Sequence, residues 1–556
     1  MHNLRILPVA LLALSSGAFA QQVPSAGSQL QQIPPAPVSD QAPSPRLEIE
    51  QGEKTVNTET DTATIKVNVL RVDGATVYSE PDLIALTRFK PGSELSLSDL
   101  RAMAEKISDY YHDNGYFLAR AYLPAQDIVN GAVTIAVIEG RYGKVVLKNE
   151  SNLNDDVANN ILSGLNSGDI IATEPLESRL LMLSGVPGVN VKSTLVPGAL
   201  FGTSDLIVEV LPGRFISGSI DADNAGSRYT GEYRLGATLN LNNVTGRGDV
   251  ASLRTLTSGS GMNYARISYQ MPVGKASLGV AYSKLNYKLG REFESLRANG
   301  TAEVASIYGS YPLIRSRNTN LSAQLVMDFR TFQDRIDSTS SVTDKKAQAL
   351  TASLVGDHRD NIGRGGVTAY SVGLTSGNLD IETPSARAFD AMTAQSNGYY
   401  NKLAFSALRL QNLTEILSLY GAISGQLASK NLDVSEKLAL GGMYGVRAYP
   451  VGEAYADEGY LATVEARFLL ARFSEHMLGQ MHFVVFADTG TVTINKDPWF
   501  VGDNRRTLSG AGVGLTWTDP GNFAIRTYYA QKLGNEVATS APDKSGRFWI
   551  QAVKYF

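Results

Sequence analysis

The segment LATVEARF, residues 461–468, alternates apolar and polar side chains from Ala462 onward. One face of an extended chain here carries Thr463, Glu465 and Arg467, whereas the opposite face carries only Ala, Val and Phe side chains. Because successive side chains of a β-strand point to opposite sides, this period of two predicts a strand. A strand with one charged face and one apolar face suits a wall that separates water from lipid.

The same alternation recurs from about residue 213 to residue 556, a region with no convincing signal for a long helix. Residues 350–354 and 417–425 are further examples, and turns bearing Gly, Asn or Asp, such as 363–366 and 519–522, separate the segments. Each segment is a weak signal, so the repetition carries the interpretation. About 340 residues are enough for roughly 16 strands. We therefore predict a transmembrane β-barrel of about 16 antiparallel strands over residues 213–556, with a soluble sandwich or propeller as the alternative.

Two smaller units precede this region, and both follow the order strand, helix, helix, strand, strand. In the first unit, residues 64–142, the segment SEPD at 79–82 places Pro and acidic residues in the first turn of a helix. In the second unit, residues 143–212, alternating patterns at 191–195 and 205–210 predict the two closing strands. The repeated order predicts two α+β domains in front of the barrel.

The first residues predict a secretory signal peptide, residues 1–20. Residues 6–14 form a short, mostly apolar run, and the segment AFA at 18–20 has the small-x-small form of a cleavage site. We therefore expect cleavage between Ala20 and Gln21. The apolar run is far shorter than the roughly 20 residues that a membrane-spanning helix needs, which disfavours a membrane anchor.

Residues 21–63 are rich in Pro, Gln and Ser, a composition that predicts a flexible linker. The repeated prolines argue against a long helix here, although residues 46–54 have room for a short helical turn. Whether any part of the linker enters and plugs the barrel is left open by its composition.

Composition excludes several classes of function. The chain has 50 basic and 54 acidic residues, a net charge of −4, which argues against a nucleic-acid binder that acts through bulk charge. It has no cysteine, and no later run of apolar residues is long enough for a membrane-spanning helix. Its five histidines form no zinc motif, and it lacks the G-x-S-x-G and Walker A motifs. We therefore expect no metal, no cofactor and no enzymatic activity.

Several segments together resemble one known family. The first unit carries YHDNGY at residues 111–116, ARAYLPAQ at 119–126 and VIEG at 137–140, which are similar to that family's first POTRA domain. The barrel region carries GGMYGVRAYP at residues 441–450 and FADTG at 486–490. These two resemble the inward-loop motif of the superfamily, usually written VRGY, and its strand motif F-x-D-x-G.

With the two repeats and the barrel, these motifs resemble the TpsB transporters of two-partner secretion, the haemolysin- and filamentous-haemagglutinin-type exporters. That family belongs to the superfamily of the barrel-assembly factor BamA. The resemblance covers about residues 64–556, and Ala448 stands where the motif more often has Gly. It implies an outer-membrane barrel preceded by two POTRA domains in the periplasm.

The resemblance also implies a functional pair. In the family, the loop that bears the first motif folds back into the barrel, and its Arg pairs with the Asp of the strand motif. Carried over, an inward loop at about residues 441–458 would place Arg447 in a salt bridge with Asp488. Alternation along the strand agrees, because it puts Asp488 on the face that water in the lumen would hydrate. The candidate site residues are Val446, Arg447, Ala448, Tyr449 and Pro450 in the loop and Phe486, Asp488 and Gly490 in the strand.

Other interpretations of this pair stay open. Arg447 and Asp488 could form a pair that only stabilises the barrel, because breaking a buried pair strands a charge whatever its role. Asp488 could also lie in an ordinary surface turn. A guanidinium binds a carboxylate through two hydrogen bonds, so the interpretation as a lock requires the two side chains to meet inside the barrel.

For function, the resemblance implies export of an unfolded TpsA-type exoprotein, a haemolysin- or adhesin-like β-helix, through the barrel without ATP. We expect a monomer in contact with outer-membrane lipid, with the exoprotein as partner and no nucleic acid. POTRA domains would capture the exoprotein by adding its chain to an exposed strand edge. Residues 191–195 are a candidate for this edge, and the alternative is that this strand is fully covered within its own domain. An assembly factor of the BamA or TamA kind and a simple porin are the alternatives. The former usually has more repeats, and the latter needs neither repeats nor the Arg447 motif.

Overall fold

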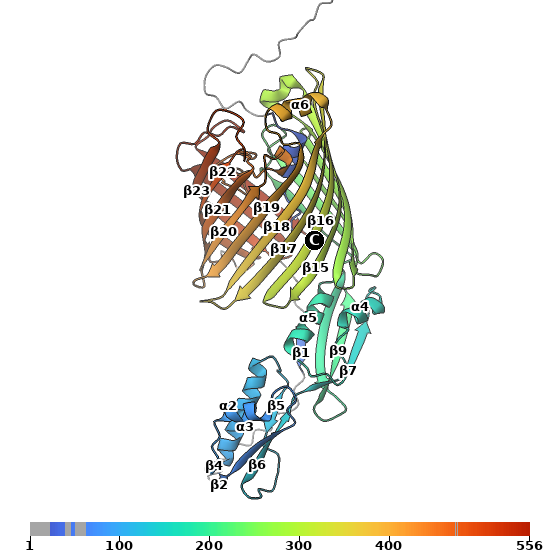
Figure 1. Ribbon diagram of the computed structural model, residues 1–556, viewed down its shortest axis with the longest axis vertical. Coiled ribbons are helices and arrows are strands. Elements are labelled where there is room, and N and C mark those ends of the chain that lie inside the picture. Colours follow the sequence, from blue (N-terminus) through green and yellow to red (C-terminus); the bar gives the residue numbers. More distant parts are fainter. Residues whose placement is uncertain (1–22, 39–45, 50–62, 473, 475) are drawn as a thin grey trace, which may run out of the picture.

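The structure is a computed structural model that describes residues 23–38, 46–49, 63–472, 474 and 476–556. Two small α+β units lie below a large barrel in Figure 1. The predicted cleavage site at Ala20 and Gln21 lies outside the described residues.

The first α+β unit packs two helices against a three-stranded sheet, in the order β3-β6-β5, and a two-stranded sheet of β2 and β4. Ser79 and Ser96 cap the two helices, each accepting a backbone hydrogen bond from the first turn. The strand that follows the second helix begins only at Arg120, because the backbone N–H of Ala119 closes a turn on the Tyr116 carbonyl. The elements are β2 (Thr64–Val67), β3 (Val69–Asp73), α2 (Glu80–Thr87), β4 (Ser93–Ser96), α3 (Leu97–Asp113), β5 (Arg120–Tyr122) and β6 (Ala132–Ile138).

The second α+β unit repeats the predicted order of strand, two helices and two strands. Its first strand begins at Arg141, two residues before the predicted boundary, and its core lies between the helices and the sheet. The sheet order is β1-β8-β9-β7, with β7 parallel to β9 and β8 antiparallel to β9. The elements are β7 (Arg141–Asn149), α4 (Asp155–Leu162), α5 (Thr173–Ser184), β8 (Val189–Pro197) and β9 (Thr203–Pro212).

A strand from the predicted linker completes this second sheet. β1 (Arg46–Ile49) pairs in parallel with residues 192–195 of β8. The prediction of a helical turn at 46–54 is therefore wrong for residues 46–49. An open strand edge offers unpaired N–H and C=O groups, and a proline-free extended segment can satisfy them. The candidate capture edge at 191–195 is thus occupied by the chain itself.

Sixteen strands, β10 to β25, form a closed barrel within the described residues, which confirms the predicted fold class. All neighbours are antiparallel, and β25 returns to pair with β10. We call the end beside the α+β units, where β10 begins, the near end, and the opposite end the far end. The strands are β10 (Ile216–Asp223), β11 (Arg234–Asn242), β12 (Val250–Thr257), β13 (Met262–Val273), β14 (Ala276–Lys288), β15 (Ala298–Arg315), β16 (Thr319–Ile336), β17 (Ser341–Asp360), β18 (Gly366–Ile381), β19 (Gly398–Asn412), β20 (Leu417–Ala428), β21 (Glu458–Leu469), β22 (Gln480–Thr493), β23 (Arg505–Asp519), β24 (Phe523–Lys532) and β25 (Gly546–Tyr555).

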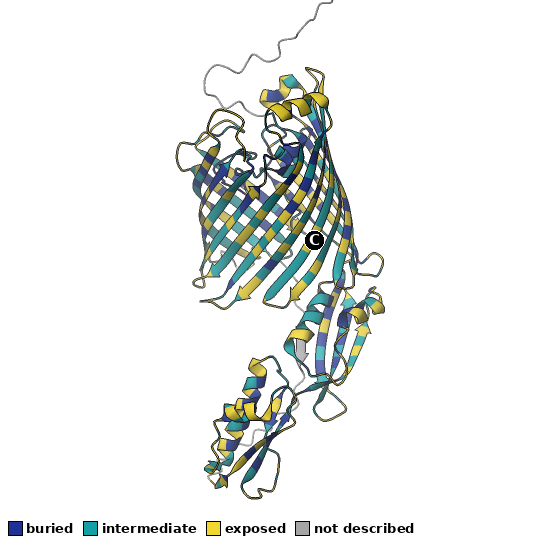
Figure 2. Cartoon of the chain, in the orientation of Figure 1, coloured by how far each residue is buried: buried dark blue, intermediate teal, exposed yellow. Residues whose placement is uncertain are grey.

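The barrel wall follows the predicted alternation. Figure 2 shows exposed and buried residues alternating along the strands. On β21, Val464 is 61% exposed and its neighbour Glu465 is buried, so the apolar side chain faces outward and the charged one faces the lumen. Among the described residues, no helix is long and apolar enough to cross a bilayer. The connections at the far end include η1 (Arg291–Leu296), α6 (Pro384–Met392) and η2 (Val434–Glu436).

A short helix, α1 (Ala26–Gln31), lies inside the barrel and contacts β14, β15, β16 and η2. The backbone N–H of Ala26 donates to Asp334 of β16 over 2.7 Å, and the Gln29 side chain accepts from Thr230 over 2.9 Å. Further along, the Val38 carbonyl accepts from the hydroxyl of Tyr555, at the near end of β25.

The prediction of a flexible linker over residues 21–63 is therefore wrong for residues 23–38. The prolines lie at the borders of α1 rather than within it, because the stretch from Ser25 to Ile33 contains none. Ser25 caps the helix and forms a capping box with Ser28, and the barrel wall supplies the apolar contacts. This part of the chain passes through the lumen and plugs its far half.

Candidate functional site: a loop folded into the barrel

The connection between β20 and β21, residues 429–457, folds back into the lumen, and we call it the inward loop. Its apolar residues join an internal cluster with side chains of β22 to β25. The turn that returns the chain depends on Gly442, whose φ of 113° is strained for residues with a side chain. Two hydrogen bonds close the turn, from Val446 N–H to the Leu440 carbonyl and from Gly442 N–H to the Tyr449 carbonyl. The predicted motif thus forms a compact tip.

Arg447 extends from this tip to the wall and meets Asp488 of β22. Its Nε and Nη2 atoms donate to the two carboxylate oxygens over 2.9 and 2.8 Å, and its backbone N–H donates over 3.1 Å. Both residues are buried, with exposed fractions of 4% and 2%. The two side chains therefore form a bidentate, water-excluded pair, the geometry in which Arg binds a carboxylate most strongly.

A second carboxylate takes part that the sequence did not single out. Arg447 Nη1 donates to Glu465 of β21 over 2.8 Å, and Arg467 binds the other oxygen of Glu465 over 2.7 Å. Thr463 donates to Asp488 over 2.9 Å. Alternation had already placed Thr463, Glu465 and Arg467 on one face of this strand, but only the antiparallel pairing of β21 with β22 puts them beside Asp488. Two cations and two anions thus balance in one cluster.

Aromatic side chains enclose the cluster. The guanidinium of Arg447 lies 3.5 Å from the ring centroid of Phe486 and 4.8 Å from that of Tyr528. Trp549 of β25 donates its indole N–H to the Arg447 carbonyl over 2.7 Å. Tyr449 lies elsewhere, under the ammonium of Lys532 at 4.5 Å. The rings exclude water and add cation–π attraction to the ion pairs.

The other candidate residues shape the contact between loop and wall. Val446, Ala448 and Tyr449 are fully buried, and Pro450 is also buried. Gly490 leaves room for the loop, since a Cβ there would lie 2.8 Å from the Leu440 side chain. The structure thus gathers all eight candidate residues at one contact, with Phe486 beside the ion pair and Tyr449 apart from it.

The first limb of the inward loop is tied to the opposite wall by further ion pairs. Asp433 binds Lys345 of β17 over 2.7 Å. Glu436 binds Lys402 of β19 over 2.6 Å and also Arg330 of β16. Because η2 lies in this limb and contacts α1, the loop and the plug occupy the far half of the lumen together.

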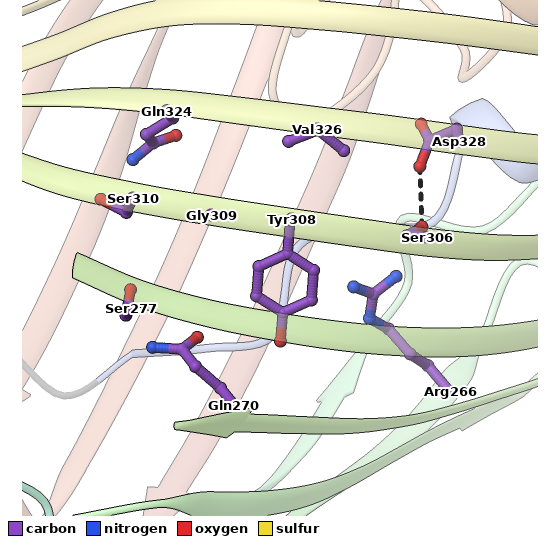
Figure 3. A pocket seen from close by; sticks show the side chains of 10 residues that line it. All are labelled: Arg266, Gln270, Ser277, Ser306, Tyr308, Gly309, Ser310, Gln324, Val326 and Asp328. Atoms are coloured by element: carbon purple, nitrogen blue, oxygen red, sulfur yellow. Dashed lines mark hydrogen bonds between the residues drawn. The ribbon is translucent and has the colours of Figure 1, made fainter. Parts of the chain in front are cut away.

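Below the plug, the wall formed by β13 to β16 borders a hollow of about 550 Å³ (Figure 3). Arg266 and Tyr308 point into it, and Ser306 donates to Asp328 over 2.7 Å at its edge. The lining is mostly polar, as expected for a barrel lumen that holds water. Among the described residues, no group of three or more His, Asp or Glu side chains is placed to hold a metal ion.

Comparison with known proteins gives the family. The model of haemolysin secretion/activation protein ShlB/FhaC/HecB matches residues 202–517, and that of the ShlB-type POTRA domain matches residues 65–140. The chain is 31% identical over 472 residues to the heme/hemopexin transporter protein HuxB of Haemophilus influenzae, which covers 84% of this chain and 82% of that protein. It is 23% identical over 460 residues to the outer membrane transporter CdiB of Dickeya dadantii, with coverages of 80% and 79%.

Two solved structures share the fold. CdiB from Escherichia coli has a TM-score of 0.70 at 21% identity, covering 91% of this chain and 93% of that chain. BamA from Haemophilus ducreyi lacking POTRA domains 1–3 has a TM-score of 0.52 at 16% identity, covering 88% and 100%. The family model spans more than half of the chain, and HuxB matches it over four-fifths of both lengths. The chain therefore belongs to the ShlB/FhaC/HecB family: it is an outer-membrane transporter of two-partner secretion, with periplasmic POTRA domains, that exports a partner exoprotein and is not an enzyme.

Proposed function

We propose that this transporter captures an unfolded, TpsA-type exoprotein of the haemolysin or adhesin kind through its POTRA domains and passes it through the barrel lumen without ATP. The near end of the barrel then faces the periplasm and the far end faces the outside. The observation that carries the proposal is the polar attachment of the inward loop. Arg447 bound to Asp488 and Glu465 is an arrangement that can break and re-form without covalent chemistry.

In this proposal, the ion-pair cluster is a lock for the resting state. The inward loop and α1 both fill the far half of the lumen, so an exoprotein needs at least one of them to move. The loop is attached to the wall through its tip, and its polar contacts become exchangeable when water or a passing chain enters. Folding of the exoprotein outside the cell supplies the driving force, because the exported chain cannot slide back once folded.

Capture is proposed to occur at the edge of β8 by strand addition. β1 already pairs there in parallel over four residue pairs, and this pairing supports the proposal that the edge accepts an added strand. A short parallel pairing is weaker than a long antiparallel one, so an exoprotein segment of greater length can replace β1. The POTRA domain is then in a resting state while β1 is bound.

The test of function is secretion in cells that lack the gene for this chain. Loss of one large protein from the culture supernatant, with other outer-membrane barrels unchanged, supports the exporter. Broad loss of outer-membrane barrels would instead identify an assembly factor of the BamA or TamA kind. Complementation with Arg447→Ala and Asp488→Ala should leave protein in the membrane but impair secretion. Normal secretion by both variants would refute the role proposed for the lock.

A further inference from the structure

One buried carboxylate on the returning limb of the inward loop accepts more hydrogen bonds than Asp488 of β22 does. Glu453 lies six residues after Arg447, on the limb that returns to β21, and its side chain is fully buried. Its carboxylate accepts a hydrogen bond from Arg506 of β23 over 2.6 Å. It also accepts four more, from the backbone N–H and the hydroxyl of both Thr539 and Ser540, over 2.7 to 2.9 Å.

Thr539 and Ser540 belong to the connection between β24 and β25, of which we call residues 536–540 the clasp. Arg506 joins the clasp to the wall, because it also donates to the Glu536 side chain over 2.7 Å and to the Val537 carbonyl over 2.8 Å. The loop tip touches the clasp as well, since Tyr449 donates its hydroxyl to the Glu536 carbonyl over 3.1 Å. The clasp thus reaches inward and holds the returning limb.

The backbone of Glu453 connects the two limbs of the inward loop. Its carbonyl accepts from the N–H groups of Leu440 and Gly441 over 3.0 and 3.2 Å, and so joins the two limbs of the loop just above the tip. A displacement of Glu453 therefore displaces the base of the tip. None of these contacts involves β21 or β22, the strands to which Arg447 binds.

We infer that Glu453 is a positioning residue that holds the inward loop in the lumen through the clasp, by an attachment separate from the Arg447 lock. A carboxylate is required, because five donors converge on it and an amide presents its own donors to them. Removing it would leave Arg506 Nη1 without its carboxylate, although Nε and Nη2 keep their bonds to Glu536 and Val537. It would also leave the backbone N–H groups of Thr539 and Ser540 buried without their acceptor, which favours displacement of the limb. The inference deepens the proposed function, and it rests on that function only where secretion is concerned.

A single cysteine can report the position of the tip, because the chain contains none. Met443 lies in the tip and is 5% exposed within the internal cluster, so Met443→Cys gives a thiol that is shielded while the loop is in place. The full chain carrying this substitution would be treated in detergent with a membrane-impermeant maleimide. We expect Glu453→Ala and Glu453→Gln to raise the labelling rate about 100-fold, as for loss of one partner of a buried pair.

Two further variants make the outcome decisive. The double variant Thr539→Val and Ser540→Ala removes two hydroxyl donors to Glu453 and keeps Arg506 and the two backbone N–H groups. The labelling rate should therefore rise by about tenfold at most. This variant gives a result even where Glu453→Ala does not fold. Glu303→Gln removes a carboxylate from an exposed ion pair with Lys284 and should leave labelling unchanged. Heat-modifiable migration in electrophoresis checks that each barrel is closed.

Unchanged labelling in closed barrels of the Glu453 variants, with faster hydrogen exchange confined to residues 533–545, overturns the inference, because the clasp would then order only itself. Labelling that rises in the Glu453 variants and again when Arg447→Ala is added supports two separate attachments. Secretion is scored separately: increased labelling with normal secretion supports the clasp as a positioning contact and shows that transport does not need it, whereas the Arg447 lock is tested by its own variants.

Discussion

At the scale of single residues, the charged side chains of the lumen are the ones whose burial needs explanation. Arg447, Asp488, Glu465 and Glu453 are all nearly inaccessible to water, and each is fully paired. Burying such charges is costly, and pairing compensates for it only with good geometry. An arrangement of this kind adds little net stability, but it fixes one position of the loop and penalises others.

Arg447→Lys tests the geometry of the lock. An ammonium cannot bind Asp488 through two parallel hydrogen bonds and reach Glu465 as well, so one of the two carboxylates loses its hydrogen bonds from this residue. We expect a loss of several-fold in secretion, smaller than the loss for Arg447→Ala, which removes the cation from the buried pair with Asp488 at a cost of about 3–5 kcal/mol while Glu465 keeps Arg467. Supernatant exoprotein, normalised to the amount of barrel in the membrane, measures the effect. Equal secretion by the Lys and Ala variants would contradict the bidentate interpretation.

A pH effect is expected from Glu139, a buried carboxylate that directly follows β6 of the first α+β unit. Burial disfavours its charged form, but hydrogen bonds from Thr76, Val77 and Tyr111 outweigh that cost and hold the pKa of Glu139 below its usual value. Since the pKa of Glu139 is lower in the folded than in the unfolded chain, the ionised carboxylate stabilises the folded state. This stabilisation is fully present above the unfolded pKa of about 4.3 and is lost as pH falls through the folded pKa.

Glu139→Gln should therefore speed hydrogen exchange of residues 64–142 at pH 7 and reduce the further change on acidification. Exchange is corrected for the intrinsic rate at each pH and followed by mass spectrometry on the full chain. Acid sensitivity that is identical in the variant and the parent chain would rule out this carboxylate as its source.

At the scale of elements, local signals and long-range pairing contribute differently. The helices α2, α3 and α4 begin where Ser79, Ser96 and Asn154 can cap them, so a short stretch of sequence is enough to place their starts. β1 has no such signal, because a four-residue strand is defined by its partner. The pairing of β10 with β25, which closes the barrel, is also short. It has five residue pairs, whereas β10 and β11 have eight.

Glu48→Pro tests the pairing of β1 with β8. Proline removes a backbone N–H and disrupts the ladder of this short strand. We expect faster hydrogen exchange of β8 and tighter binding of an unfolded exoprotein fragment to the full chain, because the competing strand is weakened. Glu382→Pro, at the border of a far-end connection, would serve as a control for general effects of proline. Unchanged or weaker binding would contradict competition at this edge.

At the scale of the whole molecule, the inward loop and α1 lie side by side in the barrel and both obstruct its lumen. The inward loop packs against β22 to β25, and α1 packs against β14 to β16. The hollow along β13 to β16 lies on the same wall as α1, on its near side. Departure of α1 would therefore extend this hollow toward the far end without any change in the strands.

Gly27→Val should loosen the plug. A Cβ at this position would lie 2.8 Å from the Cβ of Ser435 in the inward loop, and overpacking of this kind costs about 1–3 kcal/mol. Conductance in planar bilayers should rise, and deletion of residues 23–38 should raise it further. Gly421→Val is the matched control, because a Cβ there meets open space. A conductance that stays at the parent value in the deletion variant would show that α1 does not obstruct the pore.

The amino-acid sequence by itself determined the barrel, the two α+β units and the pairing of Arg447 with Asp488 as an expectation. Alternation and helix caps are local properties. The pairing was implied by the family resemblance, which the two motifs carry together with the repeats that precede them. The tertiary structure alone decided that residues 23–38 enter the lumen, that β1 covers β8, and that Glu465, Trp549 and Glu453 hold the loop. Those contacts join residues far apart in the chain, and they exist only because closing the barrel brings distant strands around one enclosed space.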